Sequence, residues 1–148
     1  MYIIEHQNIH FKNLISYNTK VRYTDILKLT QYISDNLHVL NLKKNDNIIF
    51  NKSTHVNEKM TSVEIMIPVK GKIEECDEYG YKSAFNLNNA VIIRHEGSLN
   101  DLSKTEAVLQ NFIKEHIFQT STEPYYVIIK NGNNAYDDCI IDICIGIS

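Results

Sequence analysis

A run of seven residues occurs twice in this chain, and it restricts the fold more than any other feature. Residues 63–69 (VEIMIPV) and residues 141–147 (IDICIGI) match acid to acid and apolar to apolar at one constant offset, which places Glu64 on Asp142. Each run is apolar and rich in β-branched side chains, which is typical of a buried β-strand. The repetition predicts that the chain is built from two copies of one structural unit.

The same order of elements is predicted around each copy. Apolar residues at spacings of three and four indicate a helix in each half, and short apolar runs between polar loops indicate strands. The apolar positions of the two helices align when Leu29 is placed on Leu109 and Ile33 on Ile113. The first half predicts a strand at 8–17, a helix within 22–40 and strands at 48–50 and 61–69, and the second predicts one bent strand or a strand pair at 82–95, a helix at 99–117 and strands at 125–129 and 139–147.

These elements predict a single α+β domain over residues 1–148. Its two β-α-β-β repeats, at about 8–69 and 86–147, are joined by a solvated acidic connector at 70–85. Because a unit of this size cannot bury a core by itself, we expect the repeats to merge into one antiparallel sheet with pseudo-two-fold symmetry and both helices on one face. Pro68 is expected to end its strand, since proline cannot donate to a β-ladder.

Charge and composition argue against several classes of partner. The net charge is -3 and the Lys and Arg residues are scattered singly, which disfavours nucleic-acid binding. We find no export signal and no apolar run near the roughly 20 residues of a membrane span, so we expect a cytoplasmic protein without a membrane partner. The three cysteines form no C-x-x-C pair and are expected to be buried thiols; no metal site, phosphate loop or cofactor is predicted.

The acids of the repeated run, Glu64 and Asp142, are the main candidates for ligand binding. Alternation along a strand turns each acid away from its apolar neighbours. If that face is solvated, the acids are ordinary surface groups. If it forms the floor of a partly apolar pocket, a buried carboxylate costs several kcal/mol unless a cation or hydrogen-bond donors offset it, and such a site selects cations.

Tyrosines supply the candidate aromatic walls of such a pocket, because the chain has nine tyrosines and no tryptophan. The candidates are Tyr17, Tyr23, Tyr125 and Tyr126, of which Tyr17, Tyr125 and Tyr126 are selected as site residues. A tyrosine face beside a desolvated cation contributes on the order of 1 to 2 kcal/mol. Tyrosine is also common as ordinary strand filler. Tyr125 and Tyr126 are adjacent in a strand, so one of them must face inward. His95 is interpreted as a structural residue at the end of a strand.

The second half resembles the GyrI-like superfamily of small-molecule-binding modules. The resemblance lies in Arg94-His95-Glu96-Gly97 after a buried strand, Pro124-Tyr125 opening another, and a last strand that holds an acid. Residues 63–68 (VEIMIP) are similar to the family's Trp-Glu-x-x-Ile-Pro pattern without the tryptophan, and residues 141–146 (IDICIG) carry a shorter acid and no proline. The resemblance implies a stand-alone module that binds an apolar, cationic small molecule in a cleft between the repeats.

Two other functions stay open. In layout the chain also resembles small Firmicute accessory proteins of type VII secretion loci, which implies a protein-binding or chaperone role toward a secreted effector. Some GyrI-like proteins resemble hydrolases, which implies a pocket acid and a tyrosine hydroxyl acting on a small molecule. We favour binding over catalysis and assign no catalytic residue. The edge strands of an open sheet leave room for a dimer.

Overall fold

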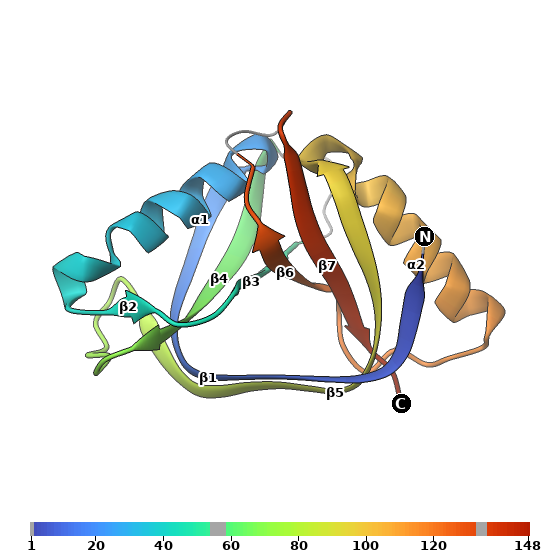
Figure 1. Cartoon of the computed structure of the whole chain (residues 1–148), viewed down its shortest axis with the longest axis horizontal. Coiled ribbons are helices and arrows are strands. Elements are labelled where there is room, and N and C mark those ends of the chain that lie inside the picture. The colour runs from blue at the N-terminus through green and yellow to red at the C-terminus, as the bar shows by residue number, and fades with distance from the viewer. Residues whose placement is uncertain (1, 54–58, 133–135) are drawn as a thin grey trace.

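The computed structural model describes residues 2–53, 59–132 and 136–148, and these residues form an α+β fold with one large antiparallel sheet and two α-helices (Figure 1). The helices are α1 (Ile26–Asp35) and α2 (Leu102–Glu115), with single 3-10 turns before α1 (Tyr23–Asp25), after α1 (Leu37–Leu40) and before α2 (Leu99–Asp101). The strands are β1 (Ile3–Arg22), β2 (Lys43–Lys44), β3 (Ile48–Lys52), β4 (Met60–Lys70), β5 (Gly80–Ser98), β6 (Tyr125–Lys130) and β7 (Asp138–Gly146).

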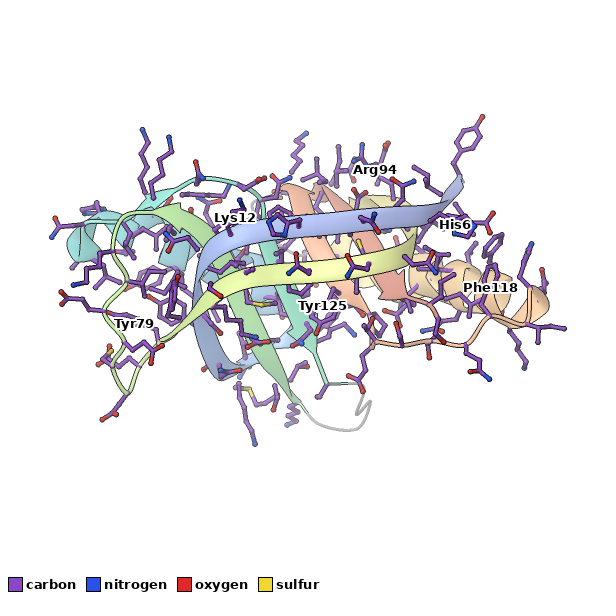
Figure 2. All side chains as sticks on the ribbon, turned by 90° about the horizontal axis from the view of Figure 1, so that it is seen from below. His6, Lys12, Tyr79, Arg94, Phe118 and Tyr125 are labelled. Carbon is purple, nitrogen blue, oxygen red and sulfur yellow. The ribbon has the colours of Figure 1, made fainter. Side chains whose placement is uncertain are left out.

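The sheet has the order β1-β5-β7-β6-β3-β4-β2, and β1 pairs with β4 as well as with β5. The long strands β1 and β5 run side by side below the other strands, as Figure 1 and the view from below in Figure 2 both show. The pairing of β3 with β6 joins the two halves at Ile49 and Val127, which are equivalent positions of the two repeats. The predicted fold class, a merged antiparallel sheet with both helices on one face, is confirmed.

The helices correspond differently from the predicted alignment, which is wrong by four positions. α1 begins at Ile26 and α2 at Leu102, and the residues in left-handed conformation that follow them are Asn41 and Ile117. Leu29 therefore corresponds to Thr105 and not to Leu109. Four positions are about one helical turn, and such a shift keeps the apolar stripe on the same side of a helix, so periodicity alone cannot detect it.

Two asparagines occupy equivalent bends in the long strands. Asn13 in β1 and Asn89 in β5 both have a φ of 55°, and both side chains donate to a backbone carbonyl just where a central strand ends. Asn13 donates to Val69 at 2.7 Å, and Asn89 donates to Ile147 at 3.3 Å. Asparagine tolerates this left-handed backbone better than most residues, so each bend is encoded by one side chain.

Apolar side chains fill both faces of the central strands. On the helix side, one core cluster joins Ile26 and Leu27 of α1 to Leu102 and Leu109 of α2. On the opposite side, a smaller cluster fills the space between the β1–β5 pair and the central strands. The second cluster consists of Leu14, Ile49, Met66, Phe85, Leu87, Ala90, Val127 and Cys144.

Several local expectations need correction. Pro68 does not end its strand, because β4 continues to Lys70. The Pro68 carbonyl accepts a hydrogen bond from the Asn45 amide. In a strand, the nitrogen and the carbonyl of one residue point to the same side, so the proline nitrogen, which has no hydrogen, points to the β3 side of β4. The pairing of β3 with β4 has already ended there, at Met66, so no ladder hydrogen bond is lost. Residues 82–95 belong to one strand, β5, and Cys76 is exposed while Cys139 and Cys144 are buried. Residues 131–134 (NGNN), whose sequence is typical of a β-hairpin turn, lie partly outside the described residues.

No helix in the described ranges has the length and apolar character that a membrane crossing requires.

Candidate functional site

Two tyrosines from different halves meet in the space between the starts of the two helices. Tyr23 lies in the turn before α1, and Tyr126 lies on the helix-facing side of β6, where it stacks on Phe50 with ring centroids 4.9 Å apart. The Tyr23 hydroxyl donates to the Leu99 carbonyl at 2.8 Å, which ties the start of α1 to the turn before α2. The helices begin close together and diverge from there (Figure 1).

A carboxylate from α2 completes this group. Glu106 accepts a hydrogen bond from the Tyr126 hydroxyl, and it is half-buried. Burial and the neighbouring Glu106 carboxylate raise the pKa of both Tyr23 and Tyr126 above the usual 10.0. Both phenols therefore keep their protons and act as donors. We call Tyr23, Phe50, Glu106 and Tyr126 the tyrosine cage.

The cage already holds a positive charge from the chain itself. The ammonium nitrogen of Lys52, at the end of β3, lies 5.4 Å from the centre of the Tyr126 ring and 5.7 Å from that of Tyr23. Both distances fall within the range of about 6 Å in which a ring face attracts a cation. The arrangement is therefore a cation site of aromatic faces and a carboxylate, filled by a lysine.

Lys52 also lines a pocket that opens beside the cage. This Lys52 pocket has a volume of about 550 Å³, and its lining includes Val63, Glu64 and Glu123. The lining takes in both faces of the sheet, because Val63 points to the helix side and Glu64 to the opposite side. The pocket therefore lies at the end of β3 and the start of β4, beside Lys52.

The two acids predicted from the repeat lie on the other face of the sheet from the cage. Val63 and Ile65 point into the helix-side core, so Glu64 between them points away, and the same alternation turns Asp142 away from Ile141 and Ile143. β3 and β6 separate β4 from β7, so the two acids stand about 14 Å apart across the sheet, and the strand register places them about 7 Å apart along it as well. They do not share one site.

Each of these acids has a cation from the chain as its partner. Glu64 is 3.0 Å from the Lys82 ammonium and accepts from the Ser16 hydroxyl at 3.1 Å. Asp142 accepts two hydrogen bonds from Arg94, at 2.8 and 3.1 Å. The side chains of Glu64 and Asp142 are only 19% and 18% exposed, so these pairings offset much of the cost of burying the two charges.

The predicted tyrosines are also divided between the two faces. Tyr126 lies in the cage, whereas Tyr125 points to the opposite side and packs edge-on against Phe85. Tyr17 faces the helix side but packs against Tyr79 with the two rings tilted by 49°, away from the cage. Of the five residues selected from the sequence, Tyr126 is in the cage and Glu64 lines the adjoining Lys52 pocket.

Sequence reasoning missed Glu106 and Lys52 as site residues. In the sequence, Glu106 occupies an ordinary polar position of an amphipathic helix, and Lys52 follows a short strand at the start of a polar loop, so neither residue stands out as a site residue. Their partners lie on other elements, far away in the chain, so no local pattern contains them. His95 is structural as expected, because one ring nitrogen bonds Thr105 at 2.7 Å and the other bonds the Ser98 carbonyl at 2.8 Å.

Comparison with solved structures shows that the fold is a known one. The chain is similar to the C-terminal domain of EcmrR, with a TM-score of 0.66, 14% identity and coverage of 100% of this chain and 99% of that domain. It is also similar to a hydrolase from Listeria innocua (TM-score 0.56, 8% identity, 96% and 91% coverage). A third similar structure is SAV2435 bound to tetraphenylphosphonium (TM-score 0.50, 9% identity, 98% and 94% coverage).

The sequence itself matches no protein-family model and no curated protein. At such low identities the structural likeness establishes the fold alone, which is consistent with the GyrI-like fold that the sequence suggested.

Proposed function

We propose that this protein binds an apolar small molecule with a positive charge in the tyrosine cage, between its two helices. The observation that carries the proposal is the position of the Lys52 ammonium over two tyrosine rings. A site that holds a lysine ammonium in this way has the chemistry to hold another cation. The proposed ligand takes the place of Lys52 between the two rings.

The surroundings of the cage favour a ligand that is apolar as well as charged. Phe50 is fully buried beneath Tyr126, and Val63, which lines the Lys52 pocket, is 3% exposed. A cation over a tyrosine face gains on the order of 1 kcal/mol when solvated and about 2 kcal/mol when desolvated. A lipophilic cation loses little hydration on entering such a site, whereas a small, strongly hydrated ammonium loses more.

Lys52 itself is suited to leave the cage. Lysine carries its charge on a flexible four-carbon stem, and Lys52 is half-buried at the end of β3. Among the described residues we find no ion pair that would hold its ammonium in place. Release of Lys52 to solvent therefore costs mainly the two ring contacts, which the incoming cation restores.

A similar fold is known with a ligand of this class. SAV2435 has been determined bound to tetraphenylphosphonium, which is an apolar cation. That likeness supports the choice of ligand class. In this proposal Tyr126 and Tyr23 are the aromatic walls and Glu106 is the cage acid, while Glu64, Asp142, Tyr17 and Tyr125 lie outside the cage.

Titration with tetraphenylphosphonium tests the proposal. We expect saturable binding by calorimetry, and about tenfold weaker binding for Glu106→Gln, because the cage then lacks its negative charge. Lys52→Met keeps the apolar stem and removes the competing charge, so it should bind several-fold more tightly. Lys52→Arg keeps the charge and should bind no more tightly than the wild type.

Lys12→Met is the matched control, since Lys12 is exposed on the outer face of β1 (Figure 2) and its loss changes the net charge by the same amount. An affinity that rises equally in Lys12→Met and Lys52→Met would show a general charge effect and would argue against the cage. Wild-type affinity in both Lys52→Met and Glu106→Gln would exclude the cage as the binding site.

The bond between Glu106 and Tyr126 also favours a second candidate function, hydrolysis of a small molecule. A carboxylate beside a phenol that keeps its proton forms an acid–base pair, and one protein of similar fold is a hydrolase from Listeria innocua. In that case a bound lipophilic epoxide should be consumed by the wild type and not by Glu106→Gln. If the wild type binds the epoxide without consuming it, hydrolysis is excluded for this substrate and binding of an apolar cation stays the proposed function.

A further inference from the structure

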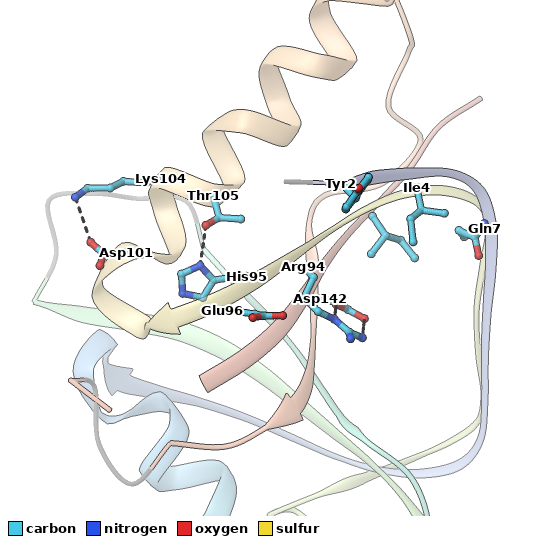
Figure 3. A pocket seen from close by; sticks show the side chains of 11 residues that line it. Tyr2, Ile4, Gln7, Arg94, His95, Glu96, Asp101, Lys104, Thr105 and Asp142 are labelled. Atoms are coloured by element: carbon cyan, nitrogen blue, oxygen red, sulfur yellow. Dashed lines mark hydrogen bonds and ion pairs between the residues drawn. The ribbon is translucent and has the colours of Figure 1, made fainter. Parts of the chain in front are cut away.

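A second pocket lies at the open edge of β5, and none of its lining residues belongs to the tyrosine cage. It has a volume of about 830 Å³ and lies between the N-terminal part of β1, the last third of β5 and the start of α2 (Figure 3). β1 pairs with β5 only as far as Ile3 with Ile93, so the edge of β5 is open beyond that point. We call this cavity the Arg94 pocket.

The Arg94 guanidinium is held at the floor of this pocket. Its Nε and Nη2 atoms donate to the two carboxylate oxygens of Asp142, which fixes the plane of the group. Of the five N–H donors of an arginine, two are used in this way, and within the described residues the other three have no acceptor. The Arg94 side chain is 51% exposed, so these donors are accessible to a ligand.

A second carboxylate stands beside Arg94 on the same strand. Glu96 follows two positions later and therefore points to the same face, about 7 Å further along β5. It is exposed and lines the pocket, and its negative charge interacts with that of Arg94, but in the part of the chain that the structure describes it has no hydrogen-bond partner. The pocket thus offers free donors and a free acceptor next to each other.

Apolar side chains lie next to these charges. Ile4 and Ile92 are cross-strand partners in β1 and β5, and both line the pocket. Ile4 is 52% exposed, so it retains apolar surface that a ligand can cover. Figure 3 shows Ile4 on the strand that faces Arg94, Asp142 and Glu96.

We propose that the Arg94 pocket binds a small zwitterion with an apolar side chain, of the amino-acid class. The ligand carboxylate accepts from the free N–H groups of Arg94, its ammonium binds Glu96, and its side chain covers Ile4 and Ile92. Asp142 acts as a positioning residue that holds the guanidinium in place. This inference does not rest on the tyrosine cage, because Arg94 and Glu96 lie on the opposite face of the sheet.

Three ligands of equal apolar size test the proposal by NMR titration of the backbone amides. Phenylalanine carries both charges, phenethylamine lacks the carboxylate, and 3-phenylpropanoate lacks the ammonium. We expect phenylalanine to bind at least tenfold more tightly than either of the others, with shifts at Ile4 and Glu96. Absence of phenylalanine binding at millimolar concentration would overturn the proposal.

The variants separate the two charge contacts. Glu96→Gln, at an exposed position, should weaken phenylalanine and phenethylamine about tenfold and leave 3-phenylpropanoate unchanged. Arg94→Lys, which keeps a charge beside Asp142 but loses the fork of donors, should weaken phenylalanine and 3-phenylpropanoate. Equal loss for all three ligands in Glu96→Gln would show a structural effect and would contradict the assigned contact. If Arg94→Lys fails to fold, Glu96→Gln decides the question.

Discussion

Ile117 has a backbone conformation that β-branched residues rarely adopt. Its φ is 58°, and its side chain is 87% exposed, so few contacts offset the steric cost of the left-handed region. We expect Ile117→Asn to raise the free energy of unfolding by about 1 kcal/mol, because asparagine accepts this conformation more readily. Urea unfolding monitored by circular dichroism measures the change.

The equivalent position after α1 provides the matched control. Asn41 has a φ of 57° and is also exposed, so Asn41→Ile should destabilise the protein by a similar amount. A loss of stability in Ile117→Asn would show that the isoleucine side chain makes contacts that outweigh its strain.

For single residues, the sequence shows which side chains are charged or aromatic, but it does not show which residues they contact in the fold. Glu64 and Asp142 were found because they repeat, and the choice between solvent and pocket stayed open. Each is mostly buried beside a cation from the chain, Lys82 or Arg94. Neither pairing has a signature in the sequence, because strand register decides which residues meet. Their role as ligands stays a prediction.

Among the elements, the bends of β1 and β5 depend on Asn13 and Asn89. We expect Asn13→Ala to destabilise the protein by about 2 kcal/mol, since alanine disfavours a φ of 55° and cannot replace the bonds to the Val69 and Gly71 carbonyls. Asn89→Ala should act in the same direction. Asn13→Gly separates the two effects in denaturant unfolding, because glycine removes the strain but not the loss of hydrogen bonds. Equal stability of the alanine variant and the wild type would refute this account of the bend.

The predicted elements were mostly correct, and the errors have physical causes. Helices and strands were predicted from the spacing of apolar residues. That spacing indicates which face of an element is buried, but it does not indicate where the element begins or ends. The helix alignment was therefore wrong by four positions, a shift that leaves the buried face unchanged. β1 extends from Ile3 to Arg22, well beyond the predicted strand at both ends, because pairing with β5 and then β4 supports polar stretches that have no strand pattern of their own.

For the whole molecule, the buried phenols predict a loss of stability in alkali. The pKa values of Tyr23 and Tyr126 are raised by burial and by Glu106 above an unfolded value near 10. Their contribution is complete below pH 10 and declines above it, where the unfolded chain loses protons that the folded chain keeps. Each phenol then reduces the free energy of unfolding by up to about 1.4 kcal/mol per pH unit. Urea unfolding between pH 9 and 11 should show this slope, and Tyr126→Phe should reduce it. An identical slope in the variant would contradict the assignment.

The whole-molecule arrangement followed from the repeated run, because two small units must share a core. The location of the tyrosine cage did not follow. It combines Tyr23 from the turn before α1, Lys52 from β3, Glu106 from α2 and Tyr126 from β6, which only the folded chain brings together. Two equivalent halves thus meet in a site that is not itself symmetric.

The NMR signals of the Lys52 side chain test the central claim most directly. In the free protein, the ring currents of Tyr23 and Tyr126 should shift the protons of the ε-methylene group upfield. Saturation with tetraphenylphosphonium should move these signals to the position of a solvent-exposed lysine, because the ligand takes the place of the ammonium between the rings. If tetraphenylphosphonium binds to saturation while the Lys52 signals keep their upfield position, the ligand does not occupy the tyrosine cage.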